Sequence, residues 1–512
     1  MSTGVVESAP APVATAVRRN VTFLAAGQLI TWTMTLLWTF VVPRKLGPAG
    51  LGTVMAAWSI TGIFGIVLGF GTRNYLVRLS VVDPDAAPSR IGTTLVARTV
   101  LSPLVFGAAF VYGHIVHWHG DTLVVLYLAA AASVLIQIAE PLQAGFQASE
   151  EMQYLAYSDI ISKSGQGLVG IAVVLLGAGA TGVTGCMAAM AGIVILLDAY
   201  WLRGRFRVDL RTNARRALRV IRESVPYWAL GVFFQLYLWI DFVMLSLLTR
   251  SDVVGWYGVP TRLFQTLMFL PVVVGTAWLP RFVRGFEEGD LRSTARAPLE
   301  LVLMLSLPIC ALTAVSASPV IHVLYGTAYD RSVPVMALLG LSIPPMYLNI
   351  VLSQVLVAMN RQSVWTWVMV VTTVVNPIFN LALIPLTQHR YGNGAIGAAI
   401  ALFLTELVAV GIGVALVGRV VFDRGTARRV AFGVCAAAAT YAAGFVVARV
   451  AGPVASIAAA AATFVLLAAA LRLFTPEELG LIRGGLERVS RRLGGPRKRR
   501  SPGEIEARFP SP

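Results

Sequence analysis

Long uncharged stretches of apolar residues follow one another along nearly the whole chain. A helix that crosses about 30 Å of hydrocarbon needs about 20 mostly apolar residues. Stretches of that kind lie at 20–43, 46–72, 99–120, 122–139, 164–197, 224–249, 253–280, 299–318, 333–359, 362–387, 394–418, 428–449 and 451–472. The run 164–197 is long enough for two spans, and its glycines within 177–185 favour a helical hairpin. The pattern predicts an all-α polytopic membrane protein with fourteen transmembrane helices.

The composition supports this class and excludes two others. The chain is 57% hydrophobic and 13% charged, with a mean hydropathy of +0.74. Soluble domains carry roughly a quarter charged residues, and disordered chains carry few apolar ones. Three cysteines, Cys186, Cys310 and Cys435, lie in apolar runs without disulfide or metal-ligand spacing, and we interpret them as small buried hydrophobes.

The net charge of +16 arises from 41 Lys and Arg against 25 Asp and Glu. In a soluble protein this excess would suggest nucleic acid, but its placement here indicates membrane topology. If the N-terminus is cytoplasmic, 32 of the 41 cations fall in inward-facing segments, as the positive-inside rule requires. We therefore expect both termini to be cytoplasmic. The basic loops and tail would then contact anionic lipid rather than nucleic acid.

Four segments lie outside the spans. Residues 1–17 are rich in Ala, Pro and Val and are expected to form a flexible tail, and 203–222 form a basic cytoplasmic linker. Residues 475–493 open on a capping-box pattern and carry apolar residues at helical spacing, which predicts an amphipathic cytoplasmic helix. Residues 494–512 predict a basic disordered tail.

The sequence contains no sign of catalysis. The expected outward loops are short, whereas a membrane glycosyltransferase or polysaccharide polymerase usually carries a large outer domain with acidic residues. His114, His117 and His119 match no established metal-site spacing, and no Walker motif occurs. We therefore expect neither an enzyme nor a resident metal or cofactor, and transport is the remaining class.

Several stretches, in order over most of the chain, resemble Wzx-type polysaccharide-repeat-unit flippases of the multidrug/oligosaccharidyl-lipid/polysaccharide (MOP) exporter superfamily. They are Asn20, Gly27-Gln28, Leu46-Gly47-Pro48-Ala49-Gly50-Leu51-Gly52, Asp241-Phe242-Val243-Met244-Leu245, Val254-Gly255-Trp256-Tyr257, Thr261-Arg262-Leu263, Leu279-Pro280, Leu324-Tyr325-Gly326, Ala358-Met359-Asn360-Arg361, Asn376-Pro377, Asn380, Ile384-Pro385, Gly394-Ala395-Ile396-Gly397-Ala398-Ala399 and Glu406. Trp256 departs from the small or polar residue common at its position.

The resemblance implies two pseudo-symmetric six-helix lobes, 18–202 and 223–418, that face a central cavity, with the last two spans, 428–472, outside them. It also implies flipping of undecaprenyl-pyrophosphate-linked oligosaccharide to the outer leaflet, with alternating access driven by Na⁺ or H⁺. Polysaccharide polymerase and glycosyltransferases are the partners it suggests. The alternatives are a lipid II flippase, a multidrug/cation antiporter and a non-transporting scaffold.

Charged residues inside the spans are the candidates for function, because one charge at the bilayer midplane costs at least about 2.5–3.5 kcal/mol. Asp241 and Arg262 lie roughly 12 and 15 Å below the outer ends of adjacent spans, from a rise of about 1.5 Å per residue. They are expected to form an ion pair. Arg262 either serves that packing alone or also faces the cavity and binds substrate phosphate, with Asp241 holding it.

Two further cations lie in the first lobe. Arg98 and Lys163 are expected on the cavity wall, where positive charge would lower the transfer cost of a pyrophosphate. Arg98 could instead extend to the interface. Asp159 precedes Lys163 by one turn and is expected to pair with it.

Glu406 lies near the middle of a span with no cation close in sequence. A carboxylate in that position takes up a proton or helps to bind Na⁺, and Glu406 is therefore the candidate for the coupling ion. Asn376 and Asn380 share one helix face and would offer neutral oxygens, although hydrogen bonding between helices is the commoner role of such residues.

Overall fold

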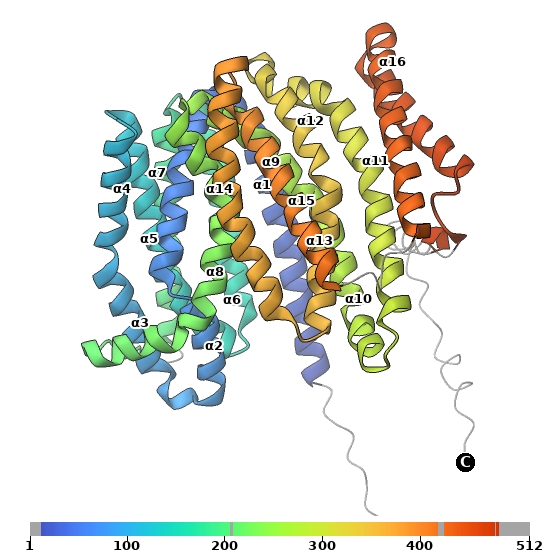
Figure 1. Ribbon diagram of the computed structural model, residues 1–512. Coiled ribbons are helices and arrows are strands. Elements are labelled where there is room, and N and C mark those ends of the chain that lie inside the picture. Colours follow the sequence, from blue (N-terminus) through green and yellow to red (C-terminus); the bar gives the residue numbers. More distant parts are fainter. Residues whose placement is uncertain (1–11, 205–207, 418–423, 477, 481–512) are drawn as a thin grey trace, which may run out of the picture.

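The computed structural model describes residues 12–204, 208–417, 424–476 and 478–480. Within these ranges the regular structure is entirely helical, which confirms the predicted all-α class. The helices stand side by side in a slab, with short connections at both ends (Figure 1).

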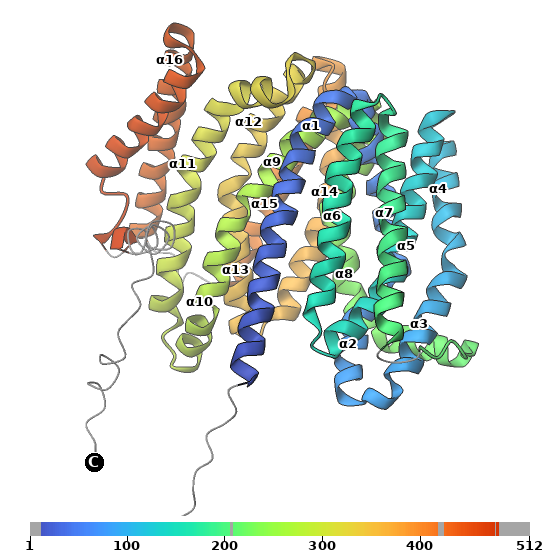
Figure 2. The same ribbon diagram turned by 180° about the vertical axis from the view of Figure 1, so that it is seen from behind.

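Seven helices form the first helix group. They are α1 (Pro12–Gly69), α2 (Thr72–Val82), α3 (Ala87–Leu101), α4 (Pro103–Ile115), α5 (Asp121–Ala148), α6 (Met152–Leu175) and α7 (Gly179–Arg203), with a short 3-10 turn, η1 (Pro84–Ala86), before α3. α6 and α7 form the predicted hairpin, and they pack on α1 and α5 (Figure 2).

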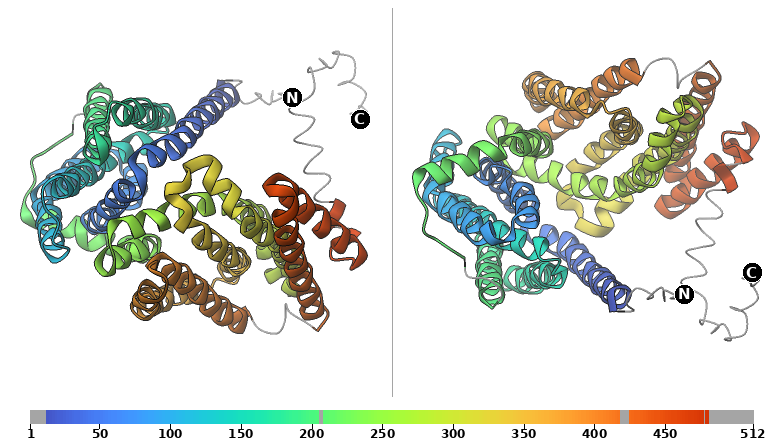
Figure 3. Two further views of the ribbon diagram at one scale, coloured as in Figure 1. Left: turned by 90° about the horizontal axis from the view of Figure 1, so that it is seen from above. Right: turned by 90° about the horizontal axis from the view of Figure 1, so that it is seen from below.

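Eight helices form the second helix group. They are α8 (Ala214–Leu248), α9 (Ser251–Leu267), α10 (Phe269–Glu287), α11 (Leu291–Tyr325), α12 (Val333–Leu341), α13 (Ile343–Ala358), α14 (Gln362–Tyr391) and α15 (Gly394–Val417), with η2 (Thr327–Ser332) before α12. The last long helix, α16 (Arg424–Ala470), packs on α11 at the edge of the molecule. Seen from above and below, the two groups lie against each other, and α16 lies apart from the first group (Figure 3).

Ten helices of the described chain are long and apolar enough to cross a membrane, or eleven if the bent pair α12–α13 counts as one span. Two of these helices contain a sharp break at a glycine. Gly47 in α1 has φ +69° and Gly452 in α16 has φ +84°, a backbone conformation that favours residues without a Cβ. Each break turns one long apolar segment into two.

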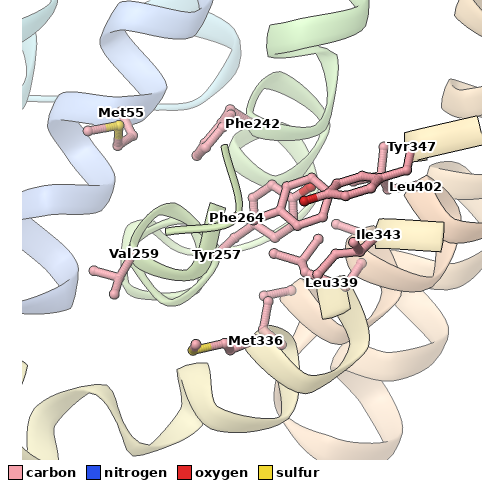
Figure 4. Packing of buried hydrophobic residues seen from close by; sticks show 14 of the residues in the cluster. Met55, Phe242, Tyr257, Val259, Phe264, Met336, Leu339, Ile343, Tyr347 and Leu402 are labelled. Carbon is pink, nitrogen blue, oxygen red and sulfur yellow. The ribbon is translucent and has the colours of Figure 1, made fainter. Parts of the chain in front are cut away.

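The largest buried cluster joins the two groups. Met55 of α1 and Phe242 of α8 pack beside Tyr257 and Phe264 of α9, as Figure 4 shows. The Tyr347 hydroxyl of α13 donates to the Leu267 carbonyl at 2.6 Å, which fixes the junction between α9 and α10. Cys186 and Cys310 are buried as predicted, but Cys435 is exposed because α16 packs along only part of its surface.

The segment that connects the groups is bound to the base of the first one. The Asp209 amide donates to the Pro88 carbonyl at 3.2 Å, and a Cβ on Gly92 would lie 1.8 Å from the Asp209 carbonyl oxygen. The Tyr75 hydroxyl donates to Glu223 at 2.5 Å, and burial together with this bond raises the pKa of Tyr75. Residues 208–213 of the predicted linker 203–222 therefore follow the first group, while 214–222 already form the first turns of α8.

Ionic contacts attach α16 and the segment after it to α11. Arg429 donates to Glu300 at 2.6 Å and also contacts Glu478. The Thr475 amide donates to the Glu478 carboxylate at 2.8 Å, and the Glu478 amide donates to the Thr475 hydroxyl at 3.2 Å. This is the predicted capping box. The rest of the predicted helix 475–493 beyond Gly480 and the tail 494–512 lie outside the described residues, whereas α1 begins at Pro12, inside the segment 1–17.

Candidate functional site

A cavity of about 680 Å³ lies inside the second helix group, with one wall residue from the first, Met55 of α1. Its lining is mostly aromatic and aliphatic, with a few polar groups, as is usual for ligand sites. The ionisable and amide side chains of the lining are Tyr237, Asp241, Tyr257, Arg262, Gln265, Asn349 and Glu406.

Glu406 of α15 is only 2% exposed and is bound through both carboxylate oxygens by neutral donors. The Tyr237 hydroxyl donates to Oε1, and the Asn349 Nδ2 donates to Oε2 at 2.7 Å. No cation pairs with this carboxylate among the described residues. The other amide atom of Asn349, Oδ1, is buried without a hydrogen-bond partner.

Asp241 of α8 has a closely similar environment, one helical turn after Tyr237. The Tyr257 hydroxyl donates to Oδ2 at 2.7 Å, and the Asn380 Nδ2 donates to Oδ1 at 2.7 Å. The same Nδ2 also donates to Asn376 Oδ1 at 2.7 Å, so both predicted amides of α14 serve Asp241 rather than Glu406. Asn380 Oδ1 has no hydrogen-bond partner although the residue is fully buried.

Arg262 of α9 lines the same cavity and its side chain is exposed. Its guanidinium forms no hydrogen bond or ion pair in the described part of the chain. The expected ion pair with Asp241 is therefore not formed, because Tyr257 and Asn380 already bind both oxygens of that carboxylate. Arg262 remains available to an anion that enters the cavity.

Arg98 lies away from this cavity, which corrects its assignment to the cavity wall. It is 1% exposed and donates to the Gly69 carbonyl at 2.7 Å and to the Thr72 hydroxyl at 2.6 Å. Its guanidinium also pairs with Glu140 at 3.2 Å. Because Gly69 ends α1 and Thr72 begins α2, Arg98 caps the break between the two helices.

Lys163 and Asp159 are both exposed on α6, and neither lines the cavity. They do not form the expected ion pair within the described residues. Two exposed side chains gain little from pairing, since solvent screens both charges. The amine of Lys163 is thus free at the surface of the first group.

The site includes three residues that the sequence did not single out as candidates: Tyr237, Tyr257 and Asn349. Tyr237 precedes Asp241 by four residues, a spacing that places both on one helix face. Tyr257 ends the Val254-Gly255-Trp256-Tyr257 stretch that carries part of the family resemblance. Asn349 is the only amide in the first half of α13, but no local pattern connects it to Glu406, because their contact depends on how α13 and α15 pack.

The two groups meet at the end of the slab where Gly47 and the start of α9 lie. A Cβ on Gly52 would lie 1.6 Å from the Ser251 carbonyl oxygen, and one on Gly255 would lie 2.0 Å from the Pro48 carbonyl oxygen. The Tyr329 hydroxyl also donates to the Pro43 carbonyl at 2.9 Å. This backbone-to-backbone contact joins the two groups at that end, which the topology predicted from the sequence places outside, and it is called here the outer closure.

Comparison with known proteins agrees with this arrangement. The structure resembles that of the lipid II flippase MurJ in an inward closed conformation, with a TM-score of 0.67 and 12% identity over 88% of this chain and 98% of that chain. It also resembles an inward-facing multidrug resistance MATE family transporter of the MOP superfamily, with a TM-score of 0.58 and 15% identity over 78% of this chain and 95% of that one. At these identities the likeness concerns the fold. No curated protein matches the chain.

The fold and two matching family profiles define a flippase or transporter of the MOP superfamily. The profile of the family described as "Polysaccharide biosynthesis protein" matches residues 17–286, more than half of the chain. The profile described as "Lipid II flippase MurJ" matches 171–451. The chain belongs to the polysaccharide biosynthesis protein family, as the resemblance to Wzx-type flippases indicated.

Proposed function

We propose that this protein flips undecaprenyl-pyrophosphate-linked oligosaccharide repeat units from the cytoplasmic to the outer leaflet of the bacterial plasma membrane, for surface polysaccharide or exopolysaccharide synthesis. The observation that carries the proposal is Arg262, an unpaired guanidinium exposed in an otherwise largely apolar cavity. A guanidinium binds phosphate oxygens through two parallel N–H donors. The flippase profile that matches 171–451 supports transport as the activity.

The surroundings of Arg262 suit a lipid-linked glycan. Trp239 and Trp365 line the cavity and offer broad ring faces, while Gln265 offers donors and acceptors for hydroxyl groups. Lys163 on α6 would provide a second contact for phosphate before the headgroup reaches the cavity. Anionic lipids would contact the basic loops and tail, and the polymerase and glycosyltransferases would supply and consume the substrate.

We infer that transport alternates between inward and outward states and is coupled to Na⁺ or H⁺. Glu406 and Asp241 are the coupling groups in this proposal, with Asn376 and Asn380 as supporting amides. The outer closure is the element that must open.

The helices also allow the fourteen spans that the sequence predicts. Ten helices qualify as spans, and the bent pair α12–α13 makes eleven. Division of α1 and of α16 at their glycine breaks adds two, and α6 adds one. An even number of spans leaves both termini on the same side of the membrane, and the positive-inside rule makes that side the cytoplasm in this proposal. The helix groups α1–α7 and α8–α15 would then be the two lobes.

The first test is export of surface polysaccharide in cells that lack their own repeat-unit flippase. Arg262→Gln should reduce export by at least about tenfold, because a neutral side chain loses the charge-assisted bonds to phosphate. Arg284→Gln, an exposed arginine of α10 outside the cavity, is the matched control and should export normally. Normal export by an inserted Arg262→Gln protein would refute the proposed headgroup contact.

A lipid II flippase is the second candidate, because the family profile of that name covers 171–451. The two candidates differ in the glycan, not in the headgroup. Rescue of cells depleted of their lipid II flippase would favour the second candidate. Failure of that rescue together with restored surface polysaccharide would favour the first. A multidrug/cation antiporter would instead confer drug resistance, and an unpaired cavity arginine suits a cationic drug poorly.

A further inference from the structure

We propose that the cavity binds its anionic headgroup together with cations, so that loading of Asp241 and Glu406 by H⁺ or Na⁺ and binding of the headgroup at Arg262 reinforce each other. This inference rests on the proposed function and adds to it the sign of the coupling. Headgroup and cations occupy the same cavity in the same state instead of exchanging for one another.

The charge balance of the cavity is the first step. Among the described residues, Arg262 is the one basic side chain of the lining, and Asp241 and Glu406 are the two acidic ones. With both acids ionised, the lining carries an excess of negative charge and would repel a pyrophosphate. With one acid neutralised the lining is balanced, and with both neutralised it is positive. Anion binding is therefore favoured only after cations have entered.

The second step is that each acid has an environment able to accept a cation. Asp241 and Glu406 are 5% and 2% exposed and are bound only by tyrosine hydroxyls and asparagine amides. An ionised carboxylate so deeply buried, without a cationic partner, is costly unless a proton or metal ion neutralises it.

The unpaired amide oxygens are the third and independent observation. Asn349 and Asn380 each use Nδ2 to bind a carboxylate, while each Oδ1 is buried without a partner. Exchange of amide N and O in either residue would turn the oxygen towards the carboxyl group, where it could accept the proton of the neutral acid. The same oxygen is a suitable ligand for Na⁺, since hard cations prefer oxygen donors. The surroundings of Asp241 and of Glu406 thus each contain the oxygen acceptor that the cation-loaded state requires.

Other titratable groups near the acids do not alter this balance. Tyr237 and Tyr257 donate to the two carboxylates, and Tyr325 of α11 lies beside Arg262 on the side facing α1. α10, α13, α14 and α15 contribute no lysine, arginine or histidine to the lining. The two carboxylates and Arg262 therefore determine the electrostatics of the cavity.

The experiment measures binding of undecaprenyl pyrophosphate to the purified full-length protein, followed by tryptophan fluorescence because Trp239 and Trp365 line the cavity. Titrations run from pH 5.5 to 8.5, in sodium chloride and in choline chloride. We expect affinity to rise as pH falls or Na⁺ is added, by about 5- to 150-fold, the usual range of coupling between two ligands. Dependence on pH alone would identify H⁺ as the cation, and dependence on Na⁺ at constant pH would identify Na⁺.

Neutral variants separate the inference from the function it rests on. The double variant Asp241→Asn with Glu406→Gln should bind tightly at every pH and without Na⁺. Asp85→Asn with Glu288→Gln, exposed acids at the cytoplasmic side, is the matched control and should behave as wild type. If the Asp241→Asn, Glu406→Gln protein unfolds, the single variant Glu406→Gln should lose part of the dependence of affinity on pH and Na⁺. If the wild-type affinity for undecaprenyl pyrophosphate is unchanged or weaker at low pH or with Na⁺, cations and headgroup do not reinforce each other's binding. That result would refute this inference and leave the flippase proposal standing. Absence of binding by wild type and the double variant under all conditions would overturn both.

Discussion

Single residues show both the strength and the limit of reasoning from the sequence. Asp241, Arg262 and Glu406 were candidates because charge inside an apolar run is costly, and all three line one cavity. Their partners could not be predicted, since Tyr257, Asn380 and Asn349 come from other helices. The same argument placed Arg98 on the cavity wall, because sequence shows that a charge is buried but not which side of its helix faces a cavity.

Arg98 should matter for stability and not for headgroup binding. Arg98→Ala leaves Glu140 and the Gly69 carbonyl without their donor, and breaking a buried pair costs about 3–5 kcal/mol. We expect a clearly lower unfolding temperature in detergent, while the folded fraction still binds undecaprenyl pyrophosphate with wild-type affinity. Arg284→Ala, an exposed arginine of α10, should leave the unfolding temperature unchanged. A folded Arg98→Ala protein of normal stability that binds the headgroup weakly would return Arg98 to the cavity.

At the scale of helices, the apolar pattern predicts most boundaries closely, because a span must be long and uncharged. Span 394–418 corresponds to α15 at Gly394–Val417, and span 362–387 to α14 at Gln362–Tyr391. The pattern misses breaks inside spans. Span 333–359 is divided at Ser342 with a 41° bend, since an apolar run remains apolar through a bend.

The outer closure depends on two glycines, Gly52 of α1 and Gly255 of α9, because the absence of their side chains lets the two helices touch. Gly255→Ala would place a methyl group 2.0 Å from the Pro48 carbonyl oxygen. The overlap is relieved only if α1 and α9 move apart, and it costs the closed state about 1–3 kcal/mol. We expect spin labels on cysteines at Arg44 and Arg390, in a Cys435→Ser protein, to report longer distances and export to fall. Gly411→Ala, whose Cβ would meet no atom within 4 Å, is the control. Unchanged distances in Gly255→Ala would mean that these helix ends do not form a gate.

At the scale of the whole molecule, the excess of positive charge predicts one orientation in the membrane. The chain enters the slab at the start of α1, at the same end as α2, α3 and the first turns of α8 (Figure 1). Arg73, Arg78 and Arg90 lie at this end, together with the arginines of the linker. The sequence could predict this asymmetry without contacts, because orientation depends on the count of cations on each side and not on packing.

Thiol labelling from one side of the membrane tests that orientation and the fourteen spans together. Single cysteines at Arg44 and Arg390 should react in intact cells with a membrane-impermeant maleimide, while cysteines at Arg211 and Arg284 should react only after permeabilisation. All four positions are exposed, and Cys435→Ser removes the one native thiol that is not buried. Each added or missing span would reverse the sidedness of every position after it, so the pattern reports where an error lies. Labelling of Arg44 and Arg390 from opposite sides would refute the fourteen-span topology. Labelling of all four positions with reversed sidedness would refute the cytoplasmic termini, because the positive charge would then face outward.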